Sequence, residues 1–142
     1  MSSQEIASLV NRYVEEILNN GRFELLGEFF ATGYQRFLSP TAPPLTPEAQ
    51  QQRLAGLRTA FPDLHLTVED IIVEGDRVAF RGVLRGTHHG LFLGVPPTGK
   101  QVTAAAFDIL QIEKGKIVAH WGGPDLLSIL QQLGAAVSVP SK

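Results

Sequence analysis

An aspartate and a histidine lie on either side of a predicted turn in the C-terminal third of the sequence. The pair Lys114-Gly115 is typical of a turn between two antiparallel strands. Because lysine tolerates a positive φ poorly, a type I turn with Gly115 in the left-handed conformation is favoured over a two-residue turn. In that register Asp108 lies directly opposite His120, within reach of a hydrogen bond. With a two-residue turn, Asp108 would lie opposite Trp121 instead.

The surroundings of this predicted pair are apolar. Ala104, Ala106 and Leu110 alternate with outward positions and share one face of the strand with Asp108. A carboxylate among apolar groups disfavours its own charge unless it is paired, and a neighbouring histidine either neutralises it or is oriented by it. Such a pair suits general acid/base chemistry. Two alternatives stay open: a buried Asp–His pair that only satisfies two polar groups, and an aspartate on the solvent face of the sheet.

Two adjacent histidines, His88 and His89, follow the end of another predicted strand. Alternation along a strand turns one of them inward and the other toward water. Neither has the His-x-His or His-Glu-x-x-His spacing of a metal site, and the chain contains no cysteine. We therefore expect no metal.

The stretch LGVPPTGKQ, residues 93–101, has the glycine and lysine spacing of a phosphate-binding loop. Pro96 and Pro97, however, have no N–H to offer a phosphate, and Gln101 stands where such a loop has Ser or Thr. The residues that follow have the alternation of a strand rather than the pattern of a helix. The stretch is predicted to connect two strands and to bind no nucleotide.

The composition is that of one globular domain, predicted to span residues 1–142. The chain has 142 residues, a net charge of −2 and 44% hydrophobic residues against 18% charged ones. Its basic residues are scattered, so no nucleic-acid partner is expected. The N-terminus does not resemble a secretory signal, and no apolar stretch is long enough to span a bilayer. We expect a cytoplasmic protein with no membrane partner, whose surplus of apolar side chains lines a pocket or an oligomer interface.

Helical periodicity is confined to the first 62 residues and the C-terminal end. The strongest helix is expected to begin after Ser2 or Ser3 and to stop at Asn19-Asn20-Gly21. The other expected helices are Arg22–Phe30, a helix capped by Thr46 with Pro47 at its first position and ended by Pro62, and a short one from Asp125 to Gly134.

From Leu64 the period of the hydrophobic pattern changes to two, which indicates β-strands. Gly75-Asp76 and Lys114-Gly115 are the turns of two hairpins, and the LGVPPTGKQ stretch joins them into a four-stranded antiparallel sheet. Arg81 is expected to pair with Asp70 across the first hairpin on a solvated face. The Pro-rich segment YQRFLSPTAPPLTP is predicted to be a loop with one short strand at its start. The fold class is therefore α+β, with the sheet curling around the helices.

These residues resemble a known family. The stretch GTHHGLFLGVPPTGKQVTAAAFDILQIEKGKIVAHW is similar to the pattern of SnoaL-like polyketide cyclases, within the nuclear transport factor 2-like superfamily. The resemblance extends over nearly the whole chain. It implies a cone-shaped fold in which a strongly curved antiparallel sheet and the N-terminal helices enclose one deep, mostly apolar cavity. It also implies acid/base catalysis without a metal or an organic cofactor.

The resemblance also implies roles for particular residues. Asp108, His120 and His88 fall on motif positions that could be catalytic: Asp108 as the base, His120 as its partner, and His88 as a donor to an enolate oxygen. The expected apolar walls of the substrate site are Phe37, Phe92 and Trp121.

Two departures from the family pattern stand out. Many relatives have Asp, Glu or Asn directly after the His-Trp pair, where this chain has Gly122-Gly123. Many also have an Asp-His pair where this chain has Arg36-Phe37. Both changes are expected to make the edges of the pocket more apolar.

The function predicted from the sequence is that of a cofactor-independent cyclase or isomerase acting on a hydrophobic, polyketide-like carbonyl compound. The alternative is a binding or accessory protein that uses the same cavity without chemistry, which the loss of a carboxylate at Gly122 favours. A further alternative is an epoxide hydrolase, although no Asp-Arg-Asp arrangement is evident. A homodimer is expected through the outer face of the sheet, because outward apolar residues such as Phe107 and Ile109 should not remain in water.

Overall fold

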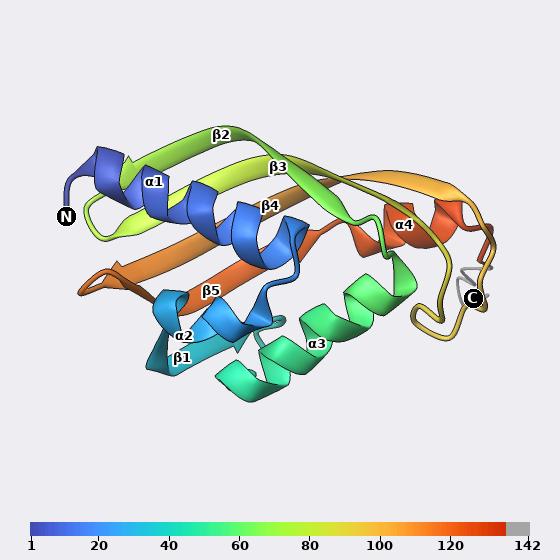
Figure 1. The fold of residues 1–142 in the computed structure, drawn as a ribbon, viewed down its shortest axis with the longest axis horizontal. Coiled ribbons are helices and arrows are strands. Elements are labelled where there is room, and N and C mark those ends of the chain that lie inside the picture. The colour runs from blue at the N-terminus through green and yellow to red at the C-terminus, as the bar shows by residue number, and fades with distance from the viewer. Residues whose placement is uncertain (136–142) are drawn as a thin grey trace, which may run out of the picture.

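One bent five-stranded sheet with helices against its inner face makes up the fold, seen in a computed structural model that describes residues 1–135 (Figure 1). This confirms the predicted α+β class. The single domain over 1–142 stays a prediction, and its residues 136–142 lie outside the described part of the chain. None of the helices in residues 1–135 has the length and apolar character needed to cross a bilayer.

The N-terminal helix begins as the sequence predicts. Helix α1 spans Ser3–Tyr13, and Ser2 caps it: the Ser2 hydroxyl accepts from the Glu5 N–H while the Glu5 carboxylate accepts from the Ser2 N–H. The helix then widens into a π-helical turn over Val14–Asn19, which the sequence did not indicate. At its end the Asn19 side chain pairs with both backbone groups of Leu66, so the helix is joined to the edge of the sheet.

The remaining helices match the predicted positions more loosely. Thr46 caps α3 and Pro47 begins it, as expected. The predicted helix over Arg22–Phe30 is two short pieces, and its last residue, Phe30, already belongs to a strand. Asp125 caps the last helix. The bounds are a 3-10 turn at Phe23–Leu25, α2 at Leu26–Phe29, α3 at Pro47–Ala60 and α4 at Leu126–Gln132.

The sheet is mixed rather than purely antiparallel. Its strand order is β1-β5-β4-β3-β2, and β1 runs parallel to β5 while every other neighbouring pair is antiparallel. The predicted short strand is thus eight residues long and adds a parallel edge, which corrects the predicted antiparallel sheet. The strands are β1 at Phe30–Phe37, β2 at His65–Glu74, β3 at Arg77–Thr87, β4 at Gln101–Glu113 and β5 at Lys116–Pro124.

Both predicted hairpins and the predicted connection are present. Gly75 and Asp76 form the turn between β2 and β3, and the Arg81 guanidinium donates to Asp70 across that hairpin, at 2.6 and 2.9 Å. Residues 88–100 join β3 to β4, and a strand rather than a helix begins at Gln101. The LGVPPTGKQ stretch therefore lacks the structural context of a phosphate-binding loop.

Alternation along the strands separates an inner from an outer face. In β4 every second side chain from Val102 to Ile112 is buried, and those between them are exposed or half-buried. The inner side chains join α1 and α3 in one hydrophobic core. Asp108 is on the inner face, with Ala104, Ala106 and Leu110, as predicted.

Candidate active site

Asp108 and His120 meet inside the molecule, although not in the predicted register. The turn between β4 and β5 has only two residues, and Lys114 and Gly115 both have positive φ, of 50° and 76°. The expectation that lysine would avoid this conformation was wrong. In the observed ladder Asp108 pairs with Gly122, and His120 pairs with Leu110.

A bulge in β5 brings the two side chains back to one face. Ile112 pairs with Ile117 and Gln111 with Ala119, so Val118 is an extra residue in β5. Without it Asp108 would face Trp121, as expected for a two-residue turn. With it, Asp108 and His120 are diagonal neighbours on the inner face, and Asp108 Oδ1 lies 2.6 Å from His120 Nε2.

Tyr34 on β1 extends this pair into a chain of three side chains. It is buried, and its hydroxyl lies 3.3 Å from His120 Nδ1. Burial raises the pKa of Tyr34 far above its usual value, so the phenol keeps its proton and donates to Nδ1. Tyr34 was not among the predicted site residues because its segment was predicted to be mostly loop. A signal was available in the sequence: Tyr34 and Arg36 are two residues apart, the spacing that places side chains on one face of a strand.

The protonation state of His120 follows from its surroundings. Burial lowers the pKa of His120 below 6.5, and the hydrogen bond that His120 donates to Asp108 only partly opposes this. The imidazole is therefore neutral at pH 7. With Nδ1 accepting from Tyr34, the proton is on Nε2 and is donated to the Asp108 carboxylate. Asp108 Oδ2 makes no hydrogen bond within residues 1–135, which leaves one carboxylate oxygen available to a ligand.

A fully buried arginine stands next to His120 in the neighbouring strand. Arg36 pairs with His120 in the β1–β5 ladder, and its guanidinium donates to the backbone carbonyls of Gly122, at 2.6 Å, Phe37, at 3.0 Å, and His120, at 3.4 Å. Its Nε is buried without a partner in the described chain. The expectation that Arg36 makes the pocket edge more apolar was wrong, because the residue brings a permanent positive charge inside.

The two glycines after Trp121 have a structural reason. Gly122 has a φ of 96°, and a Cβ there would lie 2.1 Å from the backbone oxygen of Phe107. A Cβ at Gly123 would lie 3.2 Å from the Arg36 guanidinium. This backbone therefore has no room at Gly122 for the carboxylate side chain that many relatives are expected to have there.

The cavity that receives these groups lies between the sheet, α1 with its π-helical turn, and α3. Its volume is about 60 Å³, roughly the space of two water molecules. Apolar residues make up more than half of its wall, and six of them are leucines. The polar and charged residues of the lining are Tyr13, Arg36, Gln50, Arg53, Asp108 and His120.

His88 and Phe92 do not line this cavity; they form a second cluster around Phe61. The ring centroids of His88 and Phe92 lie 5.5 and 5.1 Å from that of Phe61. The Thr98 N–H donates to His88 Nδ1, and the backbone of His88 is bonded to Gly99 and Lys100. His88 therefore ties together the two ends of the connection between β3 and β4.

Phe37 and Trp121 lie on the outer face of the sheet. They pair in the β1–β5 ladder, one residue after Arg36 and His120, and their rings stack with centroids 5.3 Å apart. The Arg77 guanidinium lies 5.6 Å from the centre of the Trp121 ring. Of the six residues predicted for the site, only Asp108 and His120 line the inner cavity. The predicted roles of the other four stay predictions.

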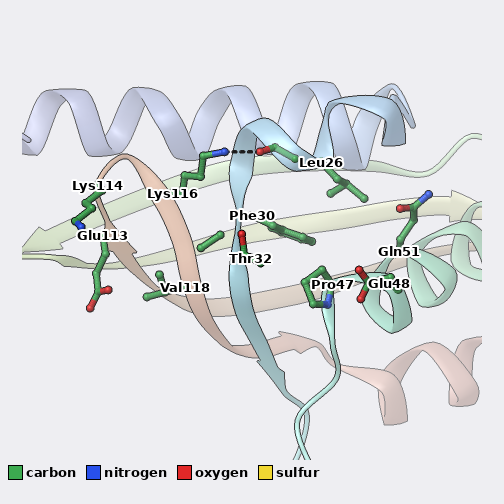
Figure 2. A pocket seen from close by; sticks show the side chains of 12 residues that line it. Leu26, Phe30, Thr32, Pro47, Glu48, Gln51, Glu113, Lys114, Lys116 and Val118 are labelled. Atoms are coloured by element: carbon green, nitrogen blue, oxygen red, sulfur yellow. Dashed lines mark hydrogen bonds between the residues drawn. The ribbon is translucent and has the colours of Figure 1, made fainter.

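A larger hollow lies elsewhere on the surface of residues 1–135. It has a volume of about 650 Å³ and lies between the α2–β1 junction, the start of α3 and the β4–β5 turn (Figure 2). Its charged lining residues are Glu48, Glu113, Lys114 and Lys116, and the Lys116 ammonium donates to the backbone carbonyl of Gly27. It lacks Asp108, His120 and Tyr34, so size alone does not identify the reactive site. Nowhere in residues 1–135 do three His, Cys, Asp or Glu side chains gather as metal ligands would.

Comparison with known proteins agrees with this architecture. The family model of SnoaL-like polyketide cyclases matches residues 8–133. This chain belongs to that family. A SnoaL-like relative, the aklanonic acid methyl ester cyclase DnrD of Streptomyces peucetius, is 32% identical over 99% of this chain and 97% of its own.

Solved structures of similar proteins have the same fold. TsrD from Streptomyces laurentii superposes with a TM-score of 0.85 at 27% identity, over 96% of this chain and 99% of its own. IdmH from Streptomyces antibioticus superposes with a TM-score of 0.80 at 34% identity, over 91% of this chain and 98% of its own. The predicted family and fold are thus confirmed.

Proposed function

We propose that this SnoaL-like protein is a cyclase that closes a ring in a hydrophobic, polyketide-like carbonyl compound by acid/base catalysis at Asp108. The observation that carries the proposal is the buried hydrogen bond between Asp108 and His120 at an otherwise mostly apolar cavity. A carboxylate held there by a neutral imidazole is oriented, is shielded from water and retains a free oxygen. The family membership supports the same class of reaction.

The proposed reaction is an intramolecular aldol addition. The Asp108 carboxylate takes a proton from a carbon next to a carbonyl, which leaves an enolate. The enolate carbon attacks a second carbonyl of the same molecule, so one carbon–carbon bond forms and closes the ring. The oxygen of the attacked carbonyl then takes the proton back from Asp108. Protons and electrons balance without an oxidant or reductant, and side chains alone carry out each step.

His120 and Tyr34 are positioning residues in this scheme. The Nε2–H of His120 holds one oxygen of Asp108, and the Tyr34 hydroxyl fixes the tautomer that makes this possible. His88 was predicted to donate to the enolate oxygen. We assign it instead to the closure of the β3–β4 connection, because its Nδ1 accepts from Thr98 and the residue lies outside the cavity lining.

The ligand must widen the cavity. Sites for drug-sized molecules usually exceed roughly 300 Å³, whereas this cavity measures about 60 Å³. On the α3 side, Arg53 and Leu57 are only half-buried, while the sheet side is held by the ladder and by Arg36. We therefore propose that the substrate enters past α3, between Arg53 and Leu57.

The test is turnover of aklanonic acid methyl ester, the compound named for the DnrD relative. We expect the purified protein to convert it to a cyclised product of equal mass, faster than buffer does, without added metal or cofactor. Product is detected by chromatography with mass spectrometry. Saturable binding without acceleration, for this ester and for a panel of simpler 1,3-dicarbonyl esters, would contradict the proposal. It would support the alternative of a non-catalytic binding protein.

A further inference from the structure

The wall that α3 contributes to the cavity has two polar side chains that lack hydrogen-bond partners within residues 1–135. Gln50 is 1% exposed, and its Oε1 is buried without a hydrogen bond in the described chain. Arg53, three residues further along the same helix, lines the same cavity and is half-buried. Within residues 1–135 its guanidinium takes part in no hydrogen bond or ion pair. Because residues three apart share a helix face, both amide and guanidinium are directed at one region of the cavity.

The charges around the cavity do not balance. Arg36 and Arg53 each carry a positive charge, Asp108 carries one negative charge, and His120 is neutral because burial lowers its pKa. Arg36 has three backbone carbonyls as partners, but Arg53 has none among residues 1–135. Burial and the nearby Arg36 both lower the pKa of Arg53. A partly desolvated cation that no carboxylate contacts directly within residues 1–135 is costly in the empty protein, and such groups concentrate at functional sites.

We propose that Arg53, with Gln50 beside it, binds a negatively charged oxygen of the ligand. The guanidinium is a planar fork of N–H donors suited to an oxyanion, and the Gln50 amide supplies one further hydrogen bond. The inference deepens the proposed function, because an oxyanion held at α3 faces the proton-accepting carboxylate across the cavity. It makes Arg53 a specificity-determining residue for this chain.

The anionic oxygen has two possible sources with the same chemistry. It is either a carboxylate that the ligand already carries, or the enolate oxygen that proton abstraction creates. Each source has a simple probe. Benzoate represents the carboxylate, with methyl benzoate as its neutral counterpart. The phenolate form of para-nitrophenol stands in for an enolate, and its absorbance reports directly whether the bound molecule is ionised.

The experiment measures equilibrium binding of these probes to the wild type, Arg53→Gln, Arg53→Lys and the control Arg85→Gln. Arg85 is exposed on β3 and outside the cavity lining, so its variant removes the same charge without touching the site. We expect the wild type to bind at least one anionic probe at least about tenfold more tightly than its neutral form. Arg53→Gln should abolish that preference, Arg53→Lys should keep part of it, and Arg85→Gln should keep all of it.

Each outcome decides the inference independently of turnover. A preference for phenolate alone identifies the enolate as the source, and a preference for benzoate identifies a carboxylate. Equal anion binding by the wild type and Arg53→Gln, preference for the neutral probes, or no binding of any probe would overturn the inference. Because binding requires no proton transfer, Arg53-dependent anion binding in a protein without cyclase activity would contradict the proposed function and leave this inference standing.

Discussion

The inner and outer faces of the β1–β5 ladder differ sharply although adjacent residues form them. Arg36 and His120 pair on the inner face, and the next residues, Phe37 and Trp121, pair on the outer face. The inner pair is buried with Asp108 among leucines, whereas the outer pair stacks at the surface. Polar groups are thus inside and aromatic rings outside, the reverse of the usual arrangement. A protein that places charge inside and apolar rings outside gives up stability at both places, which is expected where function rather than folding selects the residues.

The largest expected effect on stability comes from adding a side chain at Gly122, where β5 approaches β4 closely. Gly122→Ala should lower the free energy of unfolding by about 3 kcal/mol or more, because the new Cβ would overlap a backbone oxygen and adopt a positive φ. Urea denaturation measures it. The matched control is Gly75→Ala, which has a positive φ but no atom within 4 Å of its Cβ and should cost only about 1 kcal/mol. Equal losses in both variants would contradict the close approach at Gly122.

A smaller effect on stability is expected from pH, through His120 on the inner face. The pKa of His120 is lowered in the folded protein, so the unfolded chain binds more protons just below pH 6.5. The stability that neutral His120 contributes is therefore present above pH 6.5 and is lost as the pH falls toward the folded pKa. The slope from one such group reaches at most about 1.4 kcal/mol per pH unit.

Urea midpoints of the wild type and His120→Gln between pH 5 and 8 measure this slope. We expect the wild-type curve to fall more steeply than that of the variant below pH 6.5. Parallel curves would show that His120 does not titrate differently in the folded and unfolded states.

Substitutions on the outer face should have the smallest effect on the cavity and its activity. Ile72, Phe107 and Ile109 are exposed by 68%, 59% and 44%, and together with Trp121 they line an apolar hollow there. We expect this face to hold a homodimer, so Phe107→Lys should halve the mass measured by light scattering. It should change the activity of each folded chain by less than about twofold, since alternation separates its side chain from Asp108. A wild-type monomer at micromolar concentration would contradict the dimer.

Sequence reasoning succeeded where one periodic pattern sufficed. The caps at Ser2, Thr46 and Asp125, the hairpin turns and the face of Asp108 follow from local rules. It failed where two local irregularities offset each other. The turn at Lys114 is tighter than expected, and the bulge at Val118 returns Asp108 and His120 to the same face of the sheet. Neither has a clear signal in a single sequence, because tertiary contacts decide both.

The parts of the site on β1 were missed for a similar reason. Tyr34 and Arg36 belong to a strand that is stabilised by its parallel pairing with β5, a contact distant in sequence. Its Pro-rich continuation favoured a loop. Phe37 and Trp121 were predicted as apolar walls of the cavity, whereas the alternation along β1 and β5 places them on the outer face.

The most direct test of the proposed role of Asp108 as the base is one variant, Asp108→Asn, measured in two ways. Asparagine keeps the size of the side chain but removes the base. We expect turnover of aklanonic acid methyl ester to fall roughly a hundredfold or more while the urea midpoint stays the same or rises. The matched control, Asp70→Asn, removes an exposed carboxylate that pairs with Arg81 and should preserve turnover. A structural aspartate would instead lower stability by roughly 1–3 kcal/mol when replaced. A less stable Asp108→Asn protein with full activity per folded molecule would contradict the account and make Asp108 part of the scaffold.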